Sequence, residues 1–465
     1  MARVLLLSLY KPLKHYQISP PLGLCYLSSS LKAAGHEVLL VDLRAKRRSF
    51  REFRDRAAEF APDVVGISSL VLEHVQLQET AAEIKRLHPG ARVVVGGPFA
   101  NSLPERLLEY PDVDLVVQGE GERIFTEIAD RVGRGSADFG LPGVGRREIG
   151  GPRFVEGRLV IEDLDALPFP DWRALDLADY HDQPRHGLLY ARREYMSIVT
   201  SRGCPYHCVF CHNIMGKRFR VRSAANIVDE IETLAREHGI REITISDDVF
   251  NLDKERAKEV CDRILAKRLN LKFTFPSGLR GDVMDEDLLR RLQAIGTYKV
   301  AYGIETGSPR VQKLIRKNVD LERLREVIRT TSRLGIIVQG FFLFGFPTET
   351  REDLDRTVRY ALTTRLDLAS FNIVTAFPGT ELHAMATKMG LALDYTLDQY
   401  DYDTIDFQLS DAPTDELRRL IRRLNYRFYL NPLRLARIFR RLPRKRHVFS
   451  LAALFVRKVF LWLRA

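Results

Sequence analysis

Short runs of β-branched and aliphatic residues alternate with helical patterns along most of this 465-residue chain, and the alternation occurs in two separate series. In the first 130 residues, five runs have the composition of buried strands, with helical segments such as 22–34 between them. Strands that alternate with helices form parallel sheets covered on both faces. The first series therefore predicts an α/β fold with a doubly wound, Rossmann-like parallel sheet. The expected strands are Val4–Leu9, Val38–Val41, Val64–Ser68, Val93–Val95 and Leu115–Gln118.

The second series begins near Tyr195, after a stretch rich in Gly and Pro that we interpret as a linker over 134–190. Each proline there disfavours helix at the residue before it. Six strand–helix units in the second series predict a partial (β/α)6 barrel of the TIM type, with its site at the carboxyl ends of the strands. The expected strands are Tyr195–Thr200, Glu242–Ser246, Lys272–Phe275, Lys299–Ile304, Val338–Phe344 and Leu368–Val374.

Composition excludes several classes of protein. Hydrophobic residues make up 45% of the chain and charged residues 29%, which is typical of globular domains and excludes a disordered chain. Five cysteines are too few for a disulfide scaffold, so a reducing interior is expected. No stretch reaches the roughly 18 uncharged apolar residues of a spanning helix, and the start lacks a signal-peptide pattern. The sequence predicts a cytoplasmic protein.

Small and polar residues follow the third, fourth and fifth strands of the first series. Ligands of doubly wound sheets bind at the carboxyl ends of the strands, so these loops are candidate binding loops, together with the loop over 10–21. No Gly-x-Gly-x-x-Gly follows the first strand, which argues against a dinucleotide site. The candidate residues are Ser68, Ser69, Gly96, Gly97, Gly119 and Glu120.

Three of the five cysteines, Cys204, Cys208 and Cys211, form a C-x3-C-x2-C motif directly after the first strand of the second series. This spacing lets one loop present three thiolates to a common centre. A structural zinc site needs four ligands, and His207 or His212 is a candidate fourth. An iron–sulfur cluster held by only three cysteines leaves one iron open to a ligand. The remaining two, Cys25 and Cys261, sit singly in apolar helical patterns and are expected in the core.

The cysteine motif, with Phe210 before its last cysteine, resembles the radical S-adenosylmethionine (SAM) superfamily. The resemblance implies that the three cysteines hold a [4Fe-4S] cluster whose open iron binds SAM. In that family an electron from the cluster cleaves SAM to methionine and a 5′-deoxyadenosyl radical, which abstracts hydrogen from an unactivated carbon. It also implies an electron donor such as flavodoxin or ferredoxin.

Segments that follow later strands extend this resemblance to residues 190–385. Glu305, at a strand end, is placed to accept hydrogen bonds from hydroxyls or an ammonium group. Arg280 has the geometry to pair a carboxylate through two hydrogen bonds. Gly340 allows the backbone to approach a flat ligand. The residues that the resemblance assigns to SAM are Phe210, Asp247, Arg280, Glu305 and Gly340.

The stretch from Pro20 to Asp42 resembles the start of the cobalamin-binding domain that is fused to many radical SAM enzymes, and the loops at Gly96 and Gly119 fit its fourth and fifth loops. The chain lacks Asp-x-His-x-x-Gly, so no side chain is set to replace the nucleotide base beneath cobalt. Phe99 stands where the family often has His. The implied domains are a cobalamin-binding domain over 1–133, the linker over 134–190, a radical SAM domain over 191–390 and a basic helical region over 391–465.

Together these features resemble class B radical SAM methyltransferases, which implies methylation of an unactivated carbon of a small-molecule or lipid-like substrate with methylcobalamin. Oxidative cyclisation or rearrangement is an alternative within the same family. A tRNA methylthiotransferase is a weaker alternative, because those enzymes carry three further cysteines in the N-terminal domain and only Cys25 is present here. A carrier of cobalamin or of the cluster, with no catalysis, is a further alternative.

The C-terminal tail is strongly basic. Residues 417–465 contain fifteen Lys or Arg and no acid, with arginines and leucines on opposite faces of an expected helix over 417–424. A second amphipathic stretch, from Val448 to Trp462, carries Phe and Trp on its apolar side. Such a helix favours an anionic membrane surface. The alternatives are a helix docked on the barrel and, less favoured, a nucleic-acid contact. Peripheral contact at the inner face of the membrane is therefore one expectation.

Overall fold

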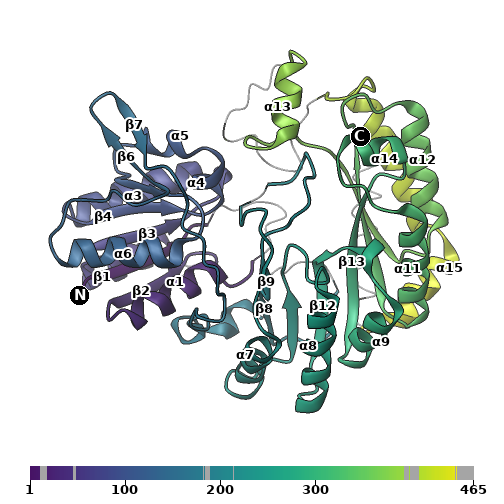
Figure 1. Cartoon of the computed structure of the whole chain (residues 1–465), viewed down its shortest axis with the longest axis horizontal. Coiled ribbons are helices and arrows are strands. Elements are labelled where there is room, and N and C mark those ends of the chain that lie inside the picture. The colour runs from purple at the N-terminus through teal and green to yellow at the C-terminus, as the bar shows by residue number, and fades with distance from the viewer. Residues whose placement is uncertain are drawn as a thin grey trace. The chain divides into compact units, whose positions relative to one another are not determined.

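The computed structural model of the protein describes residues 1–10, 18–45, 49–181, 183, 189–212, 214–391, 397, 408–445 and 447. These residues form two compact units (Figure 1). As far as they are described, the first unit contains Met1–Gln183, His212–Val221 and Ala376–Ile405, and the second contains Pro184–Cys211, Arg222–Thr375 and Asp406–Ala465. The chain therefore enters and leaves each unit more than once.

The first unit contains a seven-stranded sheet in the described part of the chain, with strand order β2-β1-β3-β4-β5-β6-β7. The five strands expected from the sequence are present and parallel, which confirms the doubly wound core. They are β1 (Arg3–Ser8), β2 (Glu37–Asp42), β3 (Val64–Ser68), β4 (Arg92–Gly96) and β5 (Leu115–Val117). The side chains of β1, β3, β4 and β5 are mostly buried because helices cover both faces, whereas the first half of the edge strand β2 is not.

The last two strands correct the expected linker. β6 (Val144–Glu148) pairs antiparallel with β5, and β7 (Gly151–Phe154) pairs antiparallel with β6, so the sheet is mixed and the start of 134–190 belongs to it. The two strands escape sequence analysis because they are short and largely exposed, with charged residues instead of an apolar alternation. Only Gly150 and Gly151, both at positive φ, mark the tight turn between them.

Helices pack on both faces of this sheet. One face carries α2 (Phe50–Phe60) and α3 (His74–Leu87), whose apolar side chains join Leu5, Leu7 and Val65 in one core. Gly66 of β3 makes room for the ring of Phe125 on a further helix, because a Cβ atom at Gly66 would lie 2.6 Å from it. The remaining helices of this region are α1 (Leu22–Ala33), α4 (Pro98–Ser102), α5 (Pro104–Leu108) and α6 (Gly121–Gly133), and the 3-10 helices are Val71–Glu73, Trp172–Ala174 and Leu177–Tyr180.

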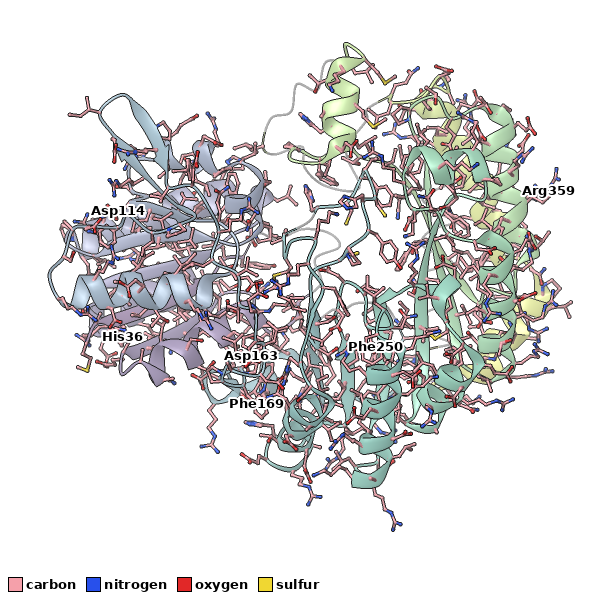
Figure 2. All side chains as sticks on the ribbon, viewed as in Figure 1. His36, Asp114, Asp163, Phe169, Phe250 and Arg359 are labelled. Atoms are coloured by element: carbon pink, nitrogen blue, oxygen red, sulfur yellow. The ribbon has the colours of Figure 1, made fainter. Side chains whose placement is uncertain are left out.

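Buried polar anchors fix the strand ends and the long connection. Asp114, labelled in Figure 2, accepts hydrogen bonds from Lys85 Nζ (2.7 Å) and from the backbone N–H of Val93 (2.7 Å), which ties α3 to β4 and β5. Tyr180 donates to Asp42 Oδ2 at 2.7 Å, and both side chains are buried. The segment that we expected to be an extended connector is thus packed onto the first unit.

The second unit contains a six-stranded parallel sheet with strand order β15-β14-β13-β12-β11-β8 in the described residues, which confirms the partial (β/α)6 barrel. The strands are β8 (Tyr195–Ile198), β11 (Glu242–Ile245), β12 (Lys272–Leu279), β13 (Thr297–Glu305), β14 (Ile337–Phe344) and β15 (Leu368–Ile373). Two short strands, β9 (Ser201–Arg202) and β10 (Arg220–Val221), stand outside this sheet. Because all six strands run the same way, the loops that carry the predicted site residues leave from one edge.

The barrel helices are amphipathic and pack their apolar sides on the strands. Phe250, labelled in Figure 2, follows β11 and packs on Phe275 of β12 with ring centroids 5.1 Å apart. The helical segment expected over 22–34 in the first series is confirmed as α1 (Leu22–Ala33), and helices also follow the strands of the second series. The helices are α7 (Ala224–Arg236), α8 (Lys254–Lys267), α9 (Glu286–Ala294), α10 (Pro309–Leu314), α11 (Leu321–Arg333) and α12 (Arg351–Thr363), and a 3-10 helix spans Gly281–Val283.

Three more helices follow, α13 (Glu381–Lys388), α14 (Thr414–Tyr429) and α15 (Pro432–Arg441). α14 confirms the expected helix, with Leu417 and Leu424 buried, and it packs on β15 through Phe428 and Phe371, whose ring centroids lie 5.6 Å apart. The described part of the tail is therefore docked on the barrel. The second amphipathic stretch, 448–462, lies outside the described residues. No helix among the residues searched is long and apolar enough to cross a membrane.

Candidate functional site

The cysteine loop leaves the barrel edge directly after β8 and β9. Its centre is fixed in two ways, since Val209 N donates to Ile315 O (3.1 Å) and Cys211 N donates to Cys208 O (3.2 Å). None of the three cysteines is in a disulfide, and Cys204 and Cys208 are half-buried while Cys211 is exposed. Cys25 and Cys261 are fully buried, as expected for core residues.

A single metal ion does not fit this loop as it stands. Among the described residues, no three His, Cys, Asp or Glu side chains converge on one ion-sized site. Nε2 of His212, a candidate fourth zinc ligand, lies 3.1 Å from the Pro378 carbonyl instead. A four-iron cluster takes each thiolate on a different iron, so it needs the sulfur atoms farther apart than a single ion does. The donor set of three free thiols on one loop fits such a cluster.

Two cations lie against the aromatic residues of this loop. The Arg280 guanidinium lies 3.8 Å from the centroid of the Tyr206 ring, and Lys317 Nζ lies 6.0 Å from that of Phe210. Burial raises the pKa of the Cys208 thiol, and the charge on Lys317 opposes that rise. Burial would lower the pKa of Lys317, but Glu305 and Cys208 outweigh it and hold this pKa above its ordinary value. Two cations therefore lie beside the loop, and each is paired with a carboxylate, Arg280 with Asp282 and Lys317 with Glu305.

Glu305 forms an ion pair with Lys317 at the end of β13. Its Oε1 accepts from Lys317 Nζ at 2.7 Å, and both groups are largely buried. Glu305 has φ 63°, a strained value for a residue with a side chain, and the register with β14 shifts between Gly303 and Glu305. A Cβ atom at Gly303 would lie 2.6 Å from both Glu305 Oε1 and Lys317 Nζ, so glycine leaves room for the pair.

Lys317 was missed by sequence analysis. It sits between Arg316 and Asn318, which have φ values of 52° and 49°, in a tight loop after α10. No motif marks this loop, because the position of Lys317 depends on β13 ending beside it. Asn and Asp adopt positive φ more often than other residues with side chains. Asn318 is therefore the only residue of this loop whose type hints at its backbone conformation.

Phe210 packs against a turn that follows β14. Its ring packs on that of Phe346, with centroids 5.8 Å apart. The buried carboxylate of Glu349 closes this turn, since its Oε2 accepts from the N–H groups of Gly345 (2.6 Å) and Phe346 (3.1 Å). Its other oxygen, Oε1, is buried without a hydrogen-bond partner. Burial raises the pKa of Glu349 to about 7, from an ordinary value of 4.5.

We expect Glu349→Gln to increase stability at alkaline pH. Because the pKa of Glu349 is raised in the folded state, the free-energy cost of burying its charged carboxylate is absent below pH 4.5. This cost grows as the pH rises and is complete above about 7. Relative to wild type, the variant should therefore gain about 2 to 3 kcal/mol between pH 5 and pH 8. Urea unfolding at both pH values measures it. Glu352→Gln, an exposed neighbour, is the control, and a gain that does not depend on pH would contradict the prediction.

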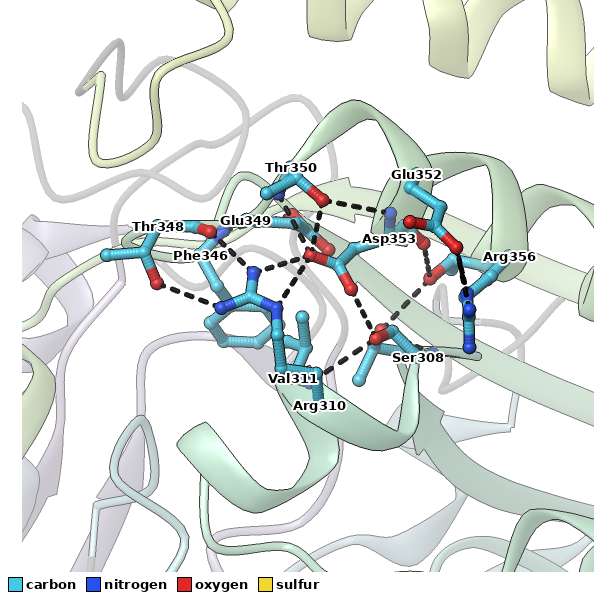
Figure 3. A network of polar contacts seen from close by, with 12 residues as sticks. Ser308, Arg310, Val311, Phe346, Thr348, Glu349, Thr350, Glu352, Asp353 and Arg356 are labelled. Atoms are coloured by element: carbon cyan, nitrogen blue, oxygen red, sulfur yellow. Dashed lines mark hydrogen bonds and ion pairs between the residues drawn. The ribbon is translucent and has the colours of Figure 1, made fainter.

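A second buried carboxylate joins the loops after β13 and β14 (Figure 3). Asp353 accepts from Arg310 Nε (3.1 Å) and from the N–H of Thr350 (3.0 Å), and Ser308 Oγ also donates to it. Burial alone would raise the pKa of Asp353, but hydrogen bonds from Arg310, Ser308 and Thr350 hold it far below its ordinary value. Asp353 thus fixes the two segments that carry Glu305 and Glu349.

Two of the predicted SAM residues are engaged by the chain itself. Asp247 is buried and its oxygens accept from Thr200 N (2.6 Å) and Ser201 Oγ (2.7 Å), so it holds the segment that leads into the cysteine loop. Arg280 does pair a carboxylate through two hydrogen bonds, but the partner is Asp282, at 2.9 and 3.0 Å. Both residues are placed to position the loop.

Gly340 is also explained by packing. A Cβ atom there would lie 2.9 Å from the side chains of Ile304 and Leu366, so packing alone requires glycine, and the SAM role of Gly340 stays a prediction. Of the predicted SAM residues, Phe210 lies within the cysteine loop, Arg280 contacts that loop through Tyr206, and Glu305 is linked to it through Lys317.

In the first unit, the predicted cobalamin loops do meet at one edge of the sheet. Ser69 N donates to Gly96 O (3.3 Å), and Asn101 bridges two loops by donating to Gly97 O (2.9 Å) and accepting from Gly119 N (2.9 Å). Asn101 was not among the predicted residues. A Cβ atom at Gly96 would be in ordinary van der Waals contact with Val117 O at 3.8 Å. The edge is lined by small residues, which lets backbone approach a bulky ring system.

The predicted cobalamin residue Glu120 is already paired with groups of the first unit. It forms a buried ion pair with Arg220 and accepts from Ile161 N at 2.9 Å. The Arg220 guanidinium also donates to the carbonyls of Ile161 (2.5 Å) and Met215 (3.1 Å). Arg220 lies nine residues after Cys211. Its ion pair with Glu120 therefore holds the segment that follows the cysteine loop in the first unit.

Breaking this pair should be costly. We expect Glu120→Ala to lower the free energy of unfolding by about 3 to 5 kcal/mol, because it leaves the Arg220 charge buried without a partner. The double variant Glu120→Met with Arg220→Met should recover most of that loss, since it removes both charges. Denaturant unfolding of the single and double variants measures the coupling. Two single losses that simply add would show that the pair does not act as a unit.

Family models match both units. Residues 13–129 match the B12 binding domain, and residues 198–361 match the Radical SAM superfamily. An uncharacterized methyltransferase of Pyrococcus horikoshii is 33% identical over 419 residues, which make up 89% of this chain and 88% of that protein. The chain belongs to the cobalamin-dependent radical SAM enzymes. Its cofactors are cobalamin, SAM and a [4Fe-4S] cluster.

Further comparisons agree with this family. The structure of the radical SAM methyltransferase TsrM from Kitasatospora setae, with cobalamin and a [4Fe-4S] cluster bound, shares the fold with a TM-score of 0.71 and 24% identity, and the match covers 90% of this chain and 85% of that one. The cytidylyl-2-hydroxyethylphosphonate methyltransferase of Streptomyces wedmorensis is 29% identical, over 80% of this chain and 78% of that protein. The anaerobic magnesium-protoporphyrin IX monomethyl ester cyclase of Rubrivivax gelatinosus is 26% identical, over 89% of this chain and 74% of that protein. This radical SAM enzyme is thus similar to methyltransferases and to a cyclase.

Proposed function

We propose that this enzyme methylates an unactivated carbon of a small-molecule or lipid-like substrate. The observation that carries the proposal is the presence in one chain of a three-cysteine loop, outside any disulfide, after the first barrel strand and of an edge of small residues on the first sheet. When bound, the cofactors supply a hydrogen-abstracting radical and a methyl group. The protein has to hold and orient these groups and to exclude water.

Each group of residues has a distinct part in this proposal. Cys204, Cys208 and Cys211 hold the cluster. Phe210 and Glu305 line SAM, with Lys317 fixing the Glu305 carboxylate by their 2.7 Å contact. Asp247 and Arg280 support the loop through their bonds to Thr200 and Asp282. In the first unit, Ser68, Ser69, Gly96, Gly97 and Gly119 form the cobalamin edge, and Glu120 stabilises it through Arg220.

A cyclase or rearrangement enzyme is the second candidate, favoured by the 26% identity to the cyclase of Rubrivivax gelatinosus. A lipid-like substrate is supported by a 26% identical relative from Methylococcus capsulatus, a hopanoid C-3 methylase. The methylthiotransferase alternative loses further support, because Cys25 is fully buried. A reductive cycle also needs a one-electron donor, and a flavodoxin or ferredoxin is the proposed partner.

The test is anaerobic reconstitution with iron, sulfide, cobalamin and a reductant, followed by incubation with methyl-deuterated SAM and extracts of cellular lipids and small metabolites. A methyltransferase should form 5′-deoxyadenosine, S-adenosylhomocysteine and a product that carries the deuterated methyl group. Formation of 5′-deoxyadenosine with a changed but unlabelled product would reject methylation and favour the cyclase.

A further inference from the structure

The helix α15 exposes its apolar side. Leu433, Leu435 and Phe439 are 78%, 47% and 50% exposed, and Leu430, just before the helix, is 54% exposed. An ordinary surface helix of a globular protein turns such residues inward. Leu435 and Phe439 are one turn apart on this side, and Leu433, two residues before Leu435, lies toward its other edge; such exposed apolar side chains need an explanation. We call Leu430, Leu433, Leu435 and Phe439 the α15 patch.

Buried arginines fix this orientation. Arg437 Nε donates to Asp367 Oδ1 (2.5 Å) and Arg441 Nη1 donates to Asp367 Oδ2 (2.9 Å), and Asp367 is fully buried at the start of β15. Arg434 Nε donates to the Leu366 carbonyl at 3.0 Å. Turning the helix to bury its leucines would leave Asp367 without these partners, which is strongly unfavourable. The apolar patch is therefore held outward by the fold.

The rest of the inward side is already packed. Ile438 and Leu442 lie in a small core with Ile337 and Leu189. The same helix thus has an inward side that contacts the barrel and an opposite, exposed side on which the described part of the chain places Lys445 Nζ, 5.0 Å from the centroid of the Phe439 ring.

The charge near the patch selects the partner. Three arginines of α15, Arg434, Arg437 and Arg441, are turned inward by their bonds to Leu366 and Asp367, and the exposed cations of the described tail remain for a partner. Arg440 and Lys445 are exposed in and just after α15, and Arg418, Arg419, Arg423 and Arg427 are exposed on α14. A two-fold contact with a second copy would set this basic surface against itself. A nucleic acid would pair the cations but would leave leucine and phenylalanine side chains with little apolar surface to meet.

We propose that the α15 patch docks the enzyme on an anionic lipid bilayer. Leu433, Leu435 and Phe439 enter the boundary between headgroups and acyl chains, and the flanking arginines and lysines contact anionic headgroups. Such a bilayer accounts for both the exposed apolar side chains and the nearby cations, because it offers apolar volume and negative charge together. The proposal does not depend on which reaction the enzyme catalyses.

The test is co-sedimentation of the full-length protein with vesicles of phosphatidylglycerol mixed with phosphatidylcholine, and with phosphatidylcholine alone. Wild type should bind the anionic vesicles and should release as salt rises from roughly 0.05 M to roughly 0.5 M. The triple variant Leu433→Ser, Leu435→Ser, Phe439→Ser should bind at least about tenfold more weakly. Ile149→Ser with Val160→Ser, which removes exposed apolar side chains of the first unit, should bind like wild type.

Two further variants distinguish the alternatives in the full chain. Phe439→Trp should show a blue-shifted tryptophan emission with anionic vesicles, which reads out insertion without depending on the triple variant. Phe455→Ser with Trp462→Ser tests the tail beyond the described residues. Wild type that stays in the supernatant, or loss of binding only in that tail variant, would overturn the proposal. A triple variant that changes from dimer to monomer by light scattering with unchanged vesicle binding would overturn it in favour of a second copy.

Discussion

Replacing any one of Cys204, Cys208 or Cys211 by alanine abolishes cluster binding and SAM cleavage. Wild type reconstituted without oxygen should contain about four iron and four sulfide per chain, whereas each variant should be colourless and form no 5′-deoxyadenosine. The physical reason is that these thiols are the only free cysteines outside the core, so no other thiol can replace a missing ligand. Iron and sulfide assays and electron paramagnetic resonance measure the loss.

Cys261→Ala is the matched control, because Cys261 is equally a free thiol but lies buried in α8. It should keep the cluster and lose only packing energy, of about 1 to 2 kcal/mol. One zinc per chain with no sulfide in the wild type, under the same anaerobic conditions, would contradict the cluster assignment.

The second large effect is expected at Gly97, where valine should abolish corrinoid binding and spare the cluster. Gly97 has φ 84° and ψ −163°, a conformation that glycine alone adopts readily. A Cβ atom there would also lie 2.7 Å from Ser68 Oγ, so the substitution displaces the loops after β3 and β4 together. Binding of hydroxocobalamin, followed by its corrin absorption bands after gel filtration, measures the loss.

Gly35→Val is the matched control for this change. Gly35 has the same φ of 84°, but nothing lies within 4 Å of its Cβ position and it follows α1, away from the glycine edge. The control therefore also places valine at a positive φ, without entering the loops. Equal loss of corrinoid in both variants would attribute the effect to general destabilisation and would remove the support for a cobalamin site at this edge.

The parts of the fold that the sequence predicted are those with a strong local signal. Runs such as Val93–Val95 are buried on both faces, so their composition alone marks them as parallel strands. The cysteine motif is equally local, because all three ligands lie within eight residues. β6 and β7 lack such a signal, since their charged side chains remain exposed and their pairing with β5 arises only in the folded chain.

Charged residues at strand ends were the least predictable part of the site. Asp247, Arg280 and Glu120 have the positions of ligand-binding groups, yet they pair with Thr200, Asp282 and Arg220 of the same chain. A sequence shows which charges stand near a site but not which of them are already neutralised. Partners such as Lys317 and Arg220 lie 12 and 100 residues away from the carboxylates that they meet, so no short motif contains both.

The path of the chain has a consequence for how this protein can be divided. Two modules joined end to end would share one junction, whereas here the chain passes between the units after Gln183 and again after Cys211, Val221 and Thr375. A cut at any one of these points leaves at least one unit without part of its chain. Neither unit can therefore be expressed whole as a single uninterrupted fragment.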